Sequence, residues 1–326
     1  MRVAIVGIGS AGCRHLKAFQ SIGDAIPIAV SSRPDCVNRL EADGVSAVGS
    51  IAEAVDSGAT LAVIASRTGS HVDQGLAALE AGCDLLVEKP LGLDAVEANR
   101  LVRAAAAGGR KLYVGCVLRF SDSLNTFRIR FGQVGPPHAI VIECRSYLPD
   151  WRRDRPYRES YSVDAFEGGV LRDLIHEVDY AGWLFGWPTS VNASLRNHGV
   201  LGIDAEETAD LSWETTDGCR ITLALDYLSR PPRRSLTVFG SEGAAHWDGI
   251  ANSVRIESAS GRNEVEQSVQ TRDEMFRAQA LAFVGATDGP EAFEAATGED
   301  GVRALAVCDA ARRASETSSV QQVKYL

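Results

Sequence analysis

The chain has 326 residues, a length that favours two domains over a single core. Hydrophobic residues make up 45% and charged residues 23%, the usual proportions of a globular protein. A net charge of −10 argues against nucleic-acid binding through bulk electrostatics, and no apolar run is long enough to cross a bilayer.

The first third of the chain alternates short apolar runs with amphipathic stretches. The runs predict strands over 2–6, 26–30, 61–65, 84–87 and 112–114, and helices over 11–22, 35–43, 50–56, 71–81 and 94–107. This alternation predicts a doubly wound parallel sheet of the Rossmann kind, with helices on both faces. The pattern changes near Arg119, so we expect a dinucleotide-binding domain over 1–118 and a second domain over 119–326.

The second domain shows period-two alternation of β-rich residues. Strands are expected over 139–147, 190–196, 207–215, 220–227, 235–239, 244–247 and 253–258, and helices over 169–184, 272–285 and 298–314. Asp217-Gly218 lies between two of these strands and predicts a hairpin. We therefore expect an α+β domain with a large, mostly antiparallel open sheet that binds substrate and forms oligomers.

A glycine motif follows the first strand and opens a helix. It reads Gly7-Ile8-Gly9-Ser10-Ala11-Gly12 and matches G-x-G-x-x-G in the context that dinucleotide binding requires. The first glycine permits the tight turn, the second lets the backbone approach a pyrophosphate, and the third lets the helix lie close to the strand. We expect these six residues to bind the cofactor, with the phosphates at the helix N-terminus.

The residues after the second strand bear on the choice of cofactor. An acidic residue is expected there when the ribose diol of NAD is bound, but the sequence reads Ser31-Ser32-Arg33. Ser32 and Arg33 can hold a 2′-phosphate, which favours NADP(H) over NAD(H). The alternatives are that Arg33 stacks on adenine or is an ordinary surface arginine.

Two segments carry candidate catalytic groups. Lys89 ends a predicted strand, where its charge can stabilise an oxygen anion during hydride transfer, and Glu88 beside it can hold it in place. Asp173 and His176 recur at i, i+3 spacing on a predicted helix, so the carboxylate can orient an imidazole that acts as general base. Taken alone, His176 is better interpreted as a satisfied core histidine, but its occurrence together with Lys89 and the glycine motif favours the catalytic interpretation. Asp179 reads as structural, and His15, His138, His198 and His246 have no partner pattern.

Four segments together are similar to the Gfo/Idh/MocA oxidoreductase family, which includes glucose–fructose oxidoreductases and inositol dehydrogenases. They are residues 7–12, Glu88-Lys89-Pro90, Arg119-Phe120 after Gly115, and residues 168–179. The resemblance covers nearly the whole chain. It implies a Rossmann domain, a C-terminal α+β domain whose open sheet often makes the oligomer interface, and hence a homodimer or homotetramer.

The resemblance also assigns roles to single residues. It implies that Lys89 and His176 are catalytic, that the Lys89–Pro90 bond is cis, and that His71 lies near the cofactor. We accordingly expect Ser66, His71, Glu88, Lys89 and Arg119 among the cofactor contacts. Two departures stand out: Arg67 replaces the usual proline before His71, and Arg172 occupies the commonest position of the helix aspartate, with Asp173 one residue later.

Residues 145–158 form the most basic stretch of an acidic protein and precede the proposed catalytic helix. Arginines bind phosphate or carboxylate, while Tyr and Trp stack on sugar or base rings. We expect Lys89, Arg119, Tyr147, Trp151, Arg172 and His176 to contact an anionic, carbohydrate-like substrate. The alternative is a solvated loop balanced by Asp150 and Asp154.

The sequence thus predicts an NAD(P)-dependent dehydrogenase or ketoreductase acting on CH–OH groups. Two other functions remain open: a catalytically silent NAD(P)-binding regulator, and reduction of a non-sugar double bond as in biliverdin reductase relatives. Seven scattered cysteines lack ligand spacing, which favours reduced thiols in the cytoplasm and no metal site. Gly7 and Gly9 interrupt the first apolar run, so we expect no secretory signal.

Overall fold

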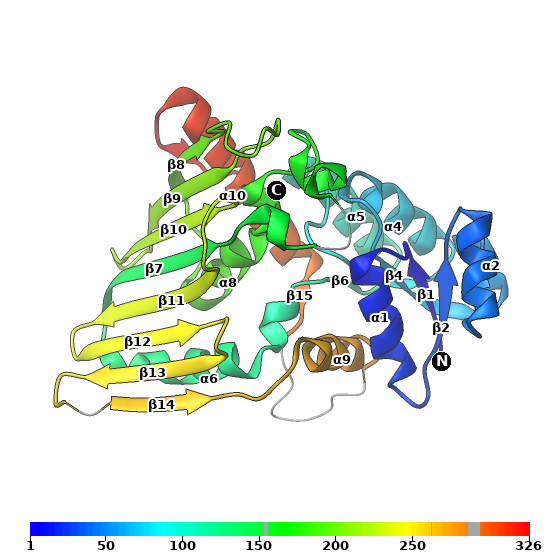
Figure 1. Cartoon of the computed structure of the whole chain (residues 1–326), viewed down its shortest axis with the longest axis horizontal. Helices are drawn as coiled ribbons and strands as arrows, with labels where there is room; N and C mark the ends of the chain where they lie inside the picture. The colour runs from blue at the N-terminus through cyan, green and yellow to red at the C-terminus, as the bar shows by residue number, and fades with distance from the viewer. Residues whose placement is uncertain (153–155, 262, 286–293) are drawn as a thin grey trace. The chain divides into compact units, whose positions relative to one another are not determined.

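The computed structural model describes residues 1–152, 156–261, 263–285 and 294–326. These residues form two compact units (Figure 1). Unit 1 comprises Met1–Phe120, Thr271–Val302 and Leu326, and unit 2 comprises Ser121–Gln270 and Arg303–Tyr325. The predicted division at residue 118 therefore lies close to the first crossing, but the chain returns to unit 1 for residues 271–302.

Unit 1 contains a seven-stranded sheet in the order β15-β6-β5-β4-β1-β2-β3. Its strands are β1 (Arg2–Val6), β2 (Ile26–Val30), β3 (Ala47–Val48), β4 (Ala59–Ile64), β5 (Asp84–Val87), β6 (Leu112–Val114) and β15 (Ala296–Thr297). All neighbours pair in parallel except β15, which adds antiparallel to β6. The order 3-2-1-4-5-6 is that of the Rossmann fold, so the predicted fold class is confirmed.

Seven helices of the described chain belong wholly or partly to unit 1. They are α1 (Ser10–Gln20), α2 (Pro34–Ala42), α3 (Ile51–Asp56), α4 (His71–Glu80), α5 (Ala95–Ala107), α9 (Arg272–Phe283) and the first residues of α10 (Gly298–Thr317). Helix starts follow from their caps: the side chains of Ser50 and Asp94 accept the N–H groups of Glu53 and Glu97.

The return of residues 271–302 to unit 1 has a packing reason. α9 lies alongside α1 (Figure 1) and places Phe276, Ala280 and Phe283 in the same buried core as Phe19. The ring of Phe283 meets Phe19 and Tyr113 edge to face, at centroid distances of 6.4 and 6.2 Å. An amphipathic helix gives no sign in the sequence of which distant sheet it will cover.

Unit 2 is built on a nine-stranded sheet in the order β14-β13-β12-β11-β7-β10-β9-β8-β16. The strands are β7 (Pro137–Arg145), β8 (Ser190–Arg196), β9 (Thr208–Glu214), β10 (Arg220–Asp226), β11 (Arg233–Gly240), β12 (Gly243–Asp248), β13 (Ser253–Ser258), β14 (Asn263–Gln267) and β16 (Gln321–Gln322). Pairing is antiparallel except between β7 and β10. The mostly antiparallel sheet and the hairpin at Gly218, whose φ is +80°, are as predicted.

Helices pack on one face of this sheet. α6 (Asp122–Arg130) contacts β12 and β13, and α8 (Ile175–Phe185) contacts β7, as Figure 1 shows. Alternate strand residues such as Ile140, Ile142 and Leu236 are buried on this face, which is the period-two pattern read from the sequence. The remaining described helical segments are α7 (Val170–Asp173) and the 3₁₀ turns η1 (Thr68–Ser70), η2 (Val117–Phe120), η3 (Phe131–Val134), η4 (Leu148–Asp150), η5 (Tyr157–Glu159) and η6 (Tyr161–Val163).

The predicted helix over 169–184 is wrong in one respect. α7 ends at Asp173 and α8 begins at Ile175, with Leu174 between them at φ −99° and ψ 29°. Asp173 and His176 therefore lie on either side of a break, so the i, i+3 argument for a shared helix face does not apply to them. Residues 170–178 contain no proline or glycine that would mark the break.

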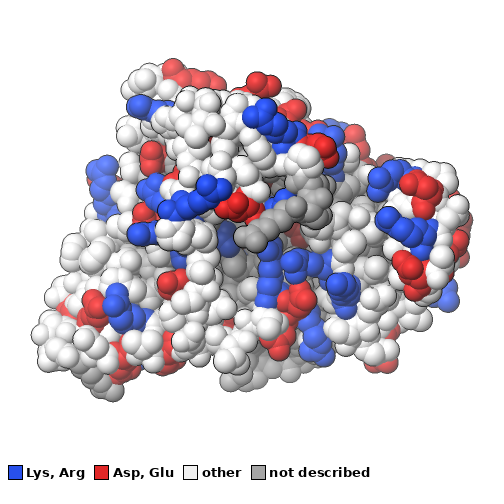
Figure 2. All heavy atoms as spheres, in the orientation of Figure 1, with Lys and Arg blue, Asp and Glu red and all other residues white. Residues whose placement is uncertain are grey.

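Both signs of charge are spread over the face drawn in Figure 2, in groups of a few side chains. The net charge of −10 is thus not gathered into one acidic surface on that face. Among the helices that the structure describes, none is both long and apolar enough to span a membrane.

Candidate active site

The glycine turn follows β1 and leads into α1. Gly7 has a φ of +90°, and its N–H donates to the carbonyl oxygen of Val30 at 3.1 Å. A Cβ on Gly7 would lie 2.7 Å from the Cα of Ser66, so the backbones after β1 and β4 touch here. A Cβ on Gly12 would lie 1.8 Å from the carbonyl oxygen of Gly7. Glycine is required at both positions by backbone packing.

The N-terminus of α1 is suited to an anion. Gly9 precedes the helix, and a Cβ there would meet nothing within 4 Å. No side chain caps this helix end, and its first turn contains no acidic residue. The backbone N–H groups from Ser10 to Gly12 thus have no side-chain acceptor in the described chain, and the helix dipole adds partial positive charge. Residues 8–11 fit a dinucleotide pyrophosphate.

The residues expected to contact the adenosine ribose of the cofactor follow the end of β2. Ser32 and Arg33 are exposed, and the backbone N–H of Arg33 donates to the Ser31 hydroxyl at 3.3 Å. Arg33 immediately precedes α2, whose first turn contains Asp35. The guanidinium is on the surface beside a helix start, a position from which it can reach a phosphate.

His71 ties together the segments that follow β4 and β5. Its Nδ1 lies 2.8 Å from the carbonyl oxygen of Pro90, and its Nε2 lies 3.3 Å from that of Ser66. The side chain is buried, and burial lowers the pKa of His71 despite both carbonyl contacts. The Ser66 hydroxyl donates to Gln74 Oε1 at 2.6 Å. His71 therefore orders the loops around the expected cofactor contacts.

Glu88, Lys89 and Pro90 follow β5, and the Lys89–Pro90 bond is cis, as the resemblance implies. Glu88 Oε1 lies 2.7 Å from Nε2 of His15, and Oε2 accepts the backbone N–H of Lys89 at 3.2 Å. Burial alone raises the pKa of Glu88, but the hydrogen bond and charge of His15, with the charge of Lys89, outweigh it and lower this pKa. Lys89 is half-buried. His15, for which the sequence shows no partner pattern, therefore does have a partner in Glu88.

Arg119 lies inside unit 1. Its side chain is 1% exposed, and its guanidinium forms an ion pair with Asp300 Oδ2 at 3.1 Å. Asp300 also accepts the N–H of Thr297 at the start of α10. This geometry favours a role for Arg119 in holding η2 to α10 over direct contact with a ligand.

In unit 2, Asp173 and His176 are buried on either side of Leu174. The hydroxyl of Tyr227, which follows β10, donates to Asp173 Oδ2 at 2.6 Å. Burial, followed by the charge of Asp173, raises the pKa of Tyr227 well above its ordinary value, so this phenol remains the donor. The sequence did not point to Tyr227, because it reads as the last residue of an alternating strand.

The next turn of α8 is anchored by a buried ion pair. Glu177 has no exposed side-chain surface, and Arg234 Nε donates to its Oε1 at 2.8 Å. Burial lowers the pKa of Arg234, but the charge of Glu177 outweighs it and raises this pKa. Cys144 lies beside the pair, and burial raises its pKa to about 12. The ion pair connects α8, which carries His176, to β11. Asp179, expected to be structural, is also buried in α8.

Arg172 is nearly buried and donates to the carbonyl oxygen of Phe166. Burial, and then the nearby charge of Arg312, lowers the pKa of Arg172. Arg312 in turn donates to Glu206 at 2.9 Å. The Glu206 carboxylate thus pairs with Arg312, and its charge partly offsets the lowering of the Arg172 pKa.

The loop after β7 brings aromatic rings together. The indole N–H of Trp151 donates to Ser146 at 2.8 Å, and its ring meets Tyr227 edge to face at 5.3 Å. Arg230 lies 3.5 Å above the ring of Tyr147. Trp151 therefore contacts the same tyrosine that holds Asp173.

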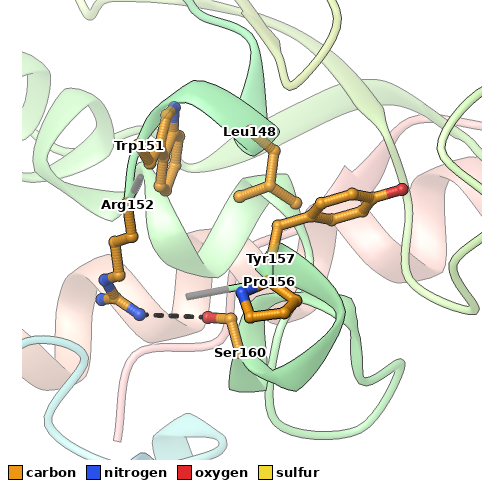
Figure 3. Close-up of a pocket in the computed structure, with 6 residues that line it drawn as sticks. All are labelled: Leu148, Trp151, Arg152, Pro156, Tyr157 and Ser160. Atoms are coloured by element: carbon orange, nitrogen blue, oxygen red, sulfur yellow. Dashed lines mark hydrogen bonds between the residues drawn. The ribbon is translucent and has the colours of Figure 1, made fainter. Parts of the chain in front are cut away.

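A small, open hollow adjoins this loop (Figure 3). Its lining is mostly apolar and comprises Leu148, Trp151, Arg152, Pro156, Tyr157 and Ser160. Arg152 spans one side of it and donates to the Ser160 hydroxyl at 3.2 Å, as the dashed line in Figure 3 marks. Arg153, Asp154 and Arg155 of the predicted basic stretch lie outside the described residues. Across the described ranges, no three His, Cys, Asp or Glu residues gather as metal ligands would.

Two family models match the chain. One, for the "Oxidoreductase family, NAD-binding Rossmann fold", matches residues 1–116. The other, for the "GFO/IDH/MocA C-terminal domain", matches residues 128–246. The chain belongs to the Gfo/Idh/MocA oxidoreductase family. The resemblance inferred from its motifs is confirmed, and with it an NAD-binding Rossmann fold.

Named relatives are sugar and cyclitol dehydrogenases. The chain is 29% identical to inositol 2-dehydrogenase of Streptomyces avermitilis over 60% of its length, a match that spans 56% of that relative. It is 26% identical to inositol 2-dehydrogenase of Rhizobium meliloti over 96% of both chains. The WlbA dehydrogenase from Bordetella pertussis, solved in complex with NADH and UDP-GlcNAcA, has the same fold, with a TM-score of 0.80, 21% identity and 99% of each chain covered.

Proposed function

We propose that the chain is an NAD(P)-dependent dehydrogenase or ketoreductase of a secondary alcohol or ketone on a sugar, nucleotide-sugar or cyclitol. The observation that carries the proposal is the position of Lys89 in unit 1. Lys89 follows β5, and the glycine turn follows β1, two strands away in the same parallel sheet. Parallel strands end at one edge, so an ammonium and a dinucleotide cradle share that edge.

The acid–base chemistry would fall to Lys89 and His176. When bound, the nicotinamide supplies or accepts the hydride. His176 would take the hydroxyl proton as the carbonyl forms, and the Lys89 ammonium would stabilise negative charge that develops on the substrate. Asp173 would help to position the segment that carries His176 through its hydrogen bond with Tyr227.

For the cofactor, we propose a preference for NADP(H) over NAD(H). Support comes from exposed Ser32 and Arg33 after β2 and from the absence of a carboxylate among residues 31–33. Glu88, Ser66 and His71 would order the loops against the cofactor, with Arg119 acting from within the unit. A charge-assisted hydrogen bond contributes about 1.5–3 kcal/mol. Arg33→Ala should therefore weaken NADPH binding about tenfold or more and leave NADH binding unchanged in calorimetric titrations.

For the substrate, we propose an anionic carbohydrate. Tyr147 and Trp151 offer rings, and Arg172 offers positive charge beside α7. Support comes from the relative named for inositol and from the fold relative solved in complex with UDP-GlcNAcA. The test is a screen of inositols and UDP-sugars with NADP⁺ and NAD⁺, followed by absorbance of the reduced nicotinamide. Lys89→Ala is the control.

Turnover in the wild type that Lys89→Ala abolishes, with cofactor affinity retained, is the expected result. Cofactor binding without turnover in either form would favour a catalytically silent regulator instead. We further place the enzyme in the cytoplasm, for which its seven free thiols are typical.

We also propose a homo-oligomer formed through the sheet of unit 2. The face of this sheet opposite α8 leaves Val141 and Phe239 more than a third exposed on neighbouring strands. Light scattering after gel filtration should give a dimer or tetramer, and Val141→Lys with Phe239→Lys should lower the mass. A monomeric wild type would contradict this assembly.

A further inference from the structure

Arg67 follows β4, which pairs in parallel with β1 at the point where the strand order of the sheet reverses. The last residues in register are Val6 and Ile64. Gly9 and Arg67 each lie three residues beyond that pair, on strands about 4.8 Å apart. Open α/β sheets bind their ligands at such a reversal, beyond the carboxyl ends of the strands. Arg67 therefore leaves the sheet where the glycine turn does.

The backbone that carries Arg67 is held against the glycine turn. A Cβ on Gly7 would lie 2.7 Å from the Cα of Ser66, so no side chain separates the two segments. Nε2 of His71 lies 3.3 Å from the carbonyl oxygen of Ser66, and the N–H of Ser70 donates to the carbonyl oxygen of Arg67 at 2.9 Å. The base of the Arg67 side chain is thereby fixed beside the turn, and the residue is exposed.

Positive charge gathers on this edge of unit 1. In the sheet order β2-β1-β4-β5, the segments after the strands carry Arg33, the N-terminus of α1, Arg67 and Lys89 in turn. Glu88, which follows β5, is buried and bonded to His15. Neither Asp nor Glu occurs in three of the segments, namely 7–12, 31–33 and 65–70. The edge therefore attracts an anion, although the whole chain has a net charge of −10.

The order of these groups predicts which part of a dinucleotide meets Arg67. The adenosine ribose is expected beside Arg33 after β2, and the nicotinamide beside Lys89 after β5. The pyrophosphate then falls between them, beside β1 and β4. There the N-terminus of α1 offers N–H groups, and a guanidinium can donate two parallel N–H groups to phosphate oxygens.

We propose that Arg67 binds the pyrophosphate of the cofactor, as a second contact beside the N-terminus of α1. The proposal rests on the cofactor site of the proposed function, and it adds a residue that lies outside the glycine motif. NAD(H) and NADP(H) both contain the pyrophosphate, so Arg67 serves either cofactor, whereas Arg33 is expected to serve NADP(H) alone.

The test is calorimetric titration with NADPH, NADH and ADP-ribose, which keeps the pyrophosphate and lacks the nicotinamide. Arg67→Gln should weaken binding of all three about tenfold at low salt, because a charge-assisted hydrogen bond is lost. Arg33→Ala should weaken NADPH alone. Arg110→Gln is the matched control: Arg110 is exposed and precedes β6, at the opposite edge of the sheet. Its loss removes the same charge and should leave all three affinities unchanged.

A series of charges at position 67 separates binding from a structural role. Arg67→Lys keeps the charge and should bind more tightly than Arg67→Gln, and Arg67→Glu should bind most weakly. These differences should shrink as NaCl is raised to about 0.5 M, because salt screens exposed charges. The melting temperatures of the variants without ligand should stay near that of wild type. A merely structural residue would instead change the melting temperature and show no dependence on charge or salt.

Equal affinities of wild type and Arg67→Gln for ADP-ribose would overturn the proposal. A loss confined to NADPH would also overturn it, since Arg67 would then contact the 2′-phosphate. Should Arg67→Gln not fold, Arg67→Lys and Arg67→Glu decide, and equal affinities of these two for ADP-ribose would refute the proposal. A wild type that binds none of the three ligands would refute the cofactor site of the proposed function, and the role of Arg67 with it.

Discussion

Substitution by alanine is expected to have different effects at Gly9 and at Gly12. Gly9 has a φ of −86°, which alanine adopts without strain, and an added methyl meets nothing within 4 Å. Gly9→Ala should therefore fold normally, with a stability within about 1 kcal/mol of wild type. In Gly12→Ala the methyl carbon would lie 1.8 Å from the Gly7 carbonyl oxygen, which forces the backbone apart by on the order of 1 Å.

The two variants separate binding from packing. If the pyrophosphate approaches the backbone at Gly9, a methyl there should weaken cofactor binding at least tenfold, or about 1.4 kcal/mol. Gly12→Ala should instead lower stability by about 1–3 kcal/mol, the cost of an overpacked core. Gly23, which lies after α1 and also has open space around it, offers a matched control that should change neither quantity.

The assay pairs thermal unfolding with calorimetric titration of NADPH and NADH. Unchanged affinity in a folded Gly9→Ala would refute the placement of the phosphates at α1. An unchanged melting temperature in Gly12→Ala would refute the packing argument.

Three further predictions concern stability. Glu177→Leu leaves the charge of Arg234 without its partner and should lower the free energy of unfolding, measured in urea, by about 3–5 kcal/mol. The double variant Glu177→Leu, Arg234→Met should recover most of that stability. Equal losses in the single and the double variant would contradict the coupling. Burial lowers the folded-state pKa of His71 below 6.5, so the unfolded chain binds the proton more readily than the folded chain does. The free energy of unfolding should therefore fall as the pH drops below 6.5, and His71→Asn should flatten this dependence on pH. Tyr227→Phe leaves Asp173 without its phenol donor and should cost about 1–3 kcal/mol, a loss that unchanged urea midpoints would disprove.

The sequence predicted the fold well where local patterns are strong. β1, β2, β5, β6, β8 and β13 have their predicted bounds, because apolar runs or alternation end at turn residues. β14 was missed, since Asn263–Gln267 is an exposed edge strand with one apolar residue in five. Strands of two residues, such as β3 and β16, are too short to show an alternating pattern of apolar and polar residues.

The site was predicted in parts. The glycine turn was predicted from its motif, which encodes local backbone geometry, whereas the cis bond at Lys89–Pro90 was implied only by the family resemblance. The contacts of His15 and Tyr227 could not be predicted, because each joins residues more than 50 positions apart. The break at Leu174 had no residue type to mark it. His15 does lie on the α1 face that carries Gly12, and this could have indicated a side chain aimed at the sheet.

The central claim is hydride transfer with Lys89 and His176 as the acid–base groups. It is tested most directly by mass spectrometry of a mixture of inositols and UDP-sugars incubated with NADP⁺ and the enzyme. The account predicts an oxidised product that has lost one hydride and one proton relative to its substrate. This product should form in the same amount as NADPH. Lys89→Ala and His176→Ala should each reduce its rate at least about a hundredfold. Undiminished oxidation in either variant would contradict the account.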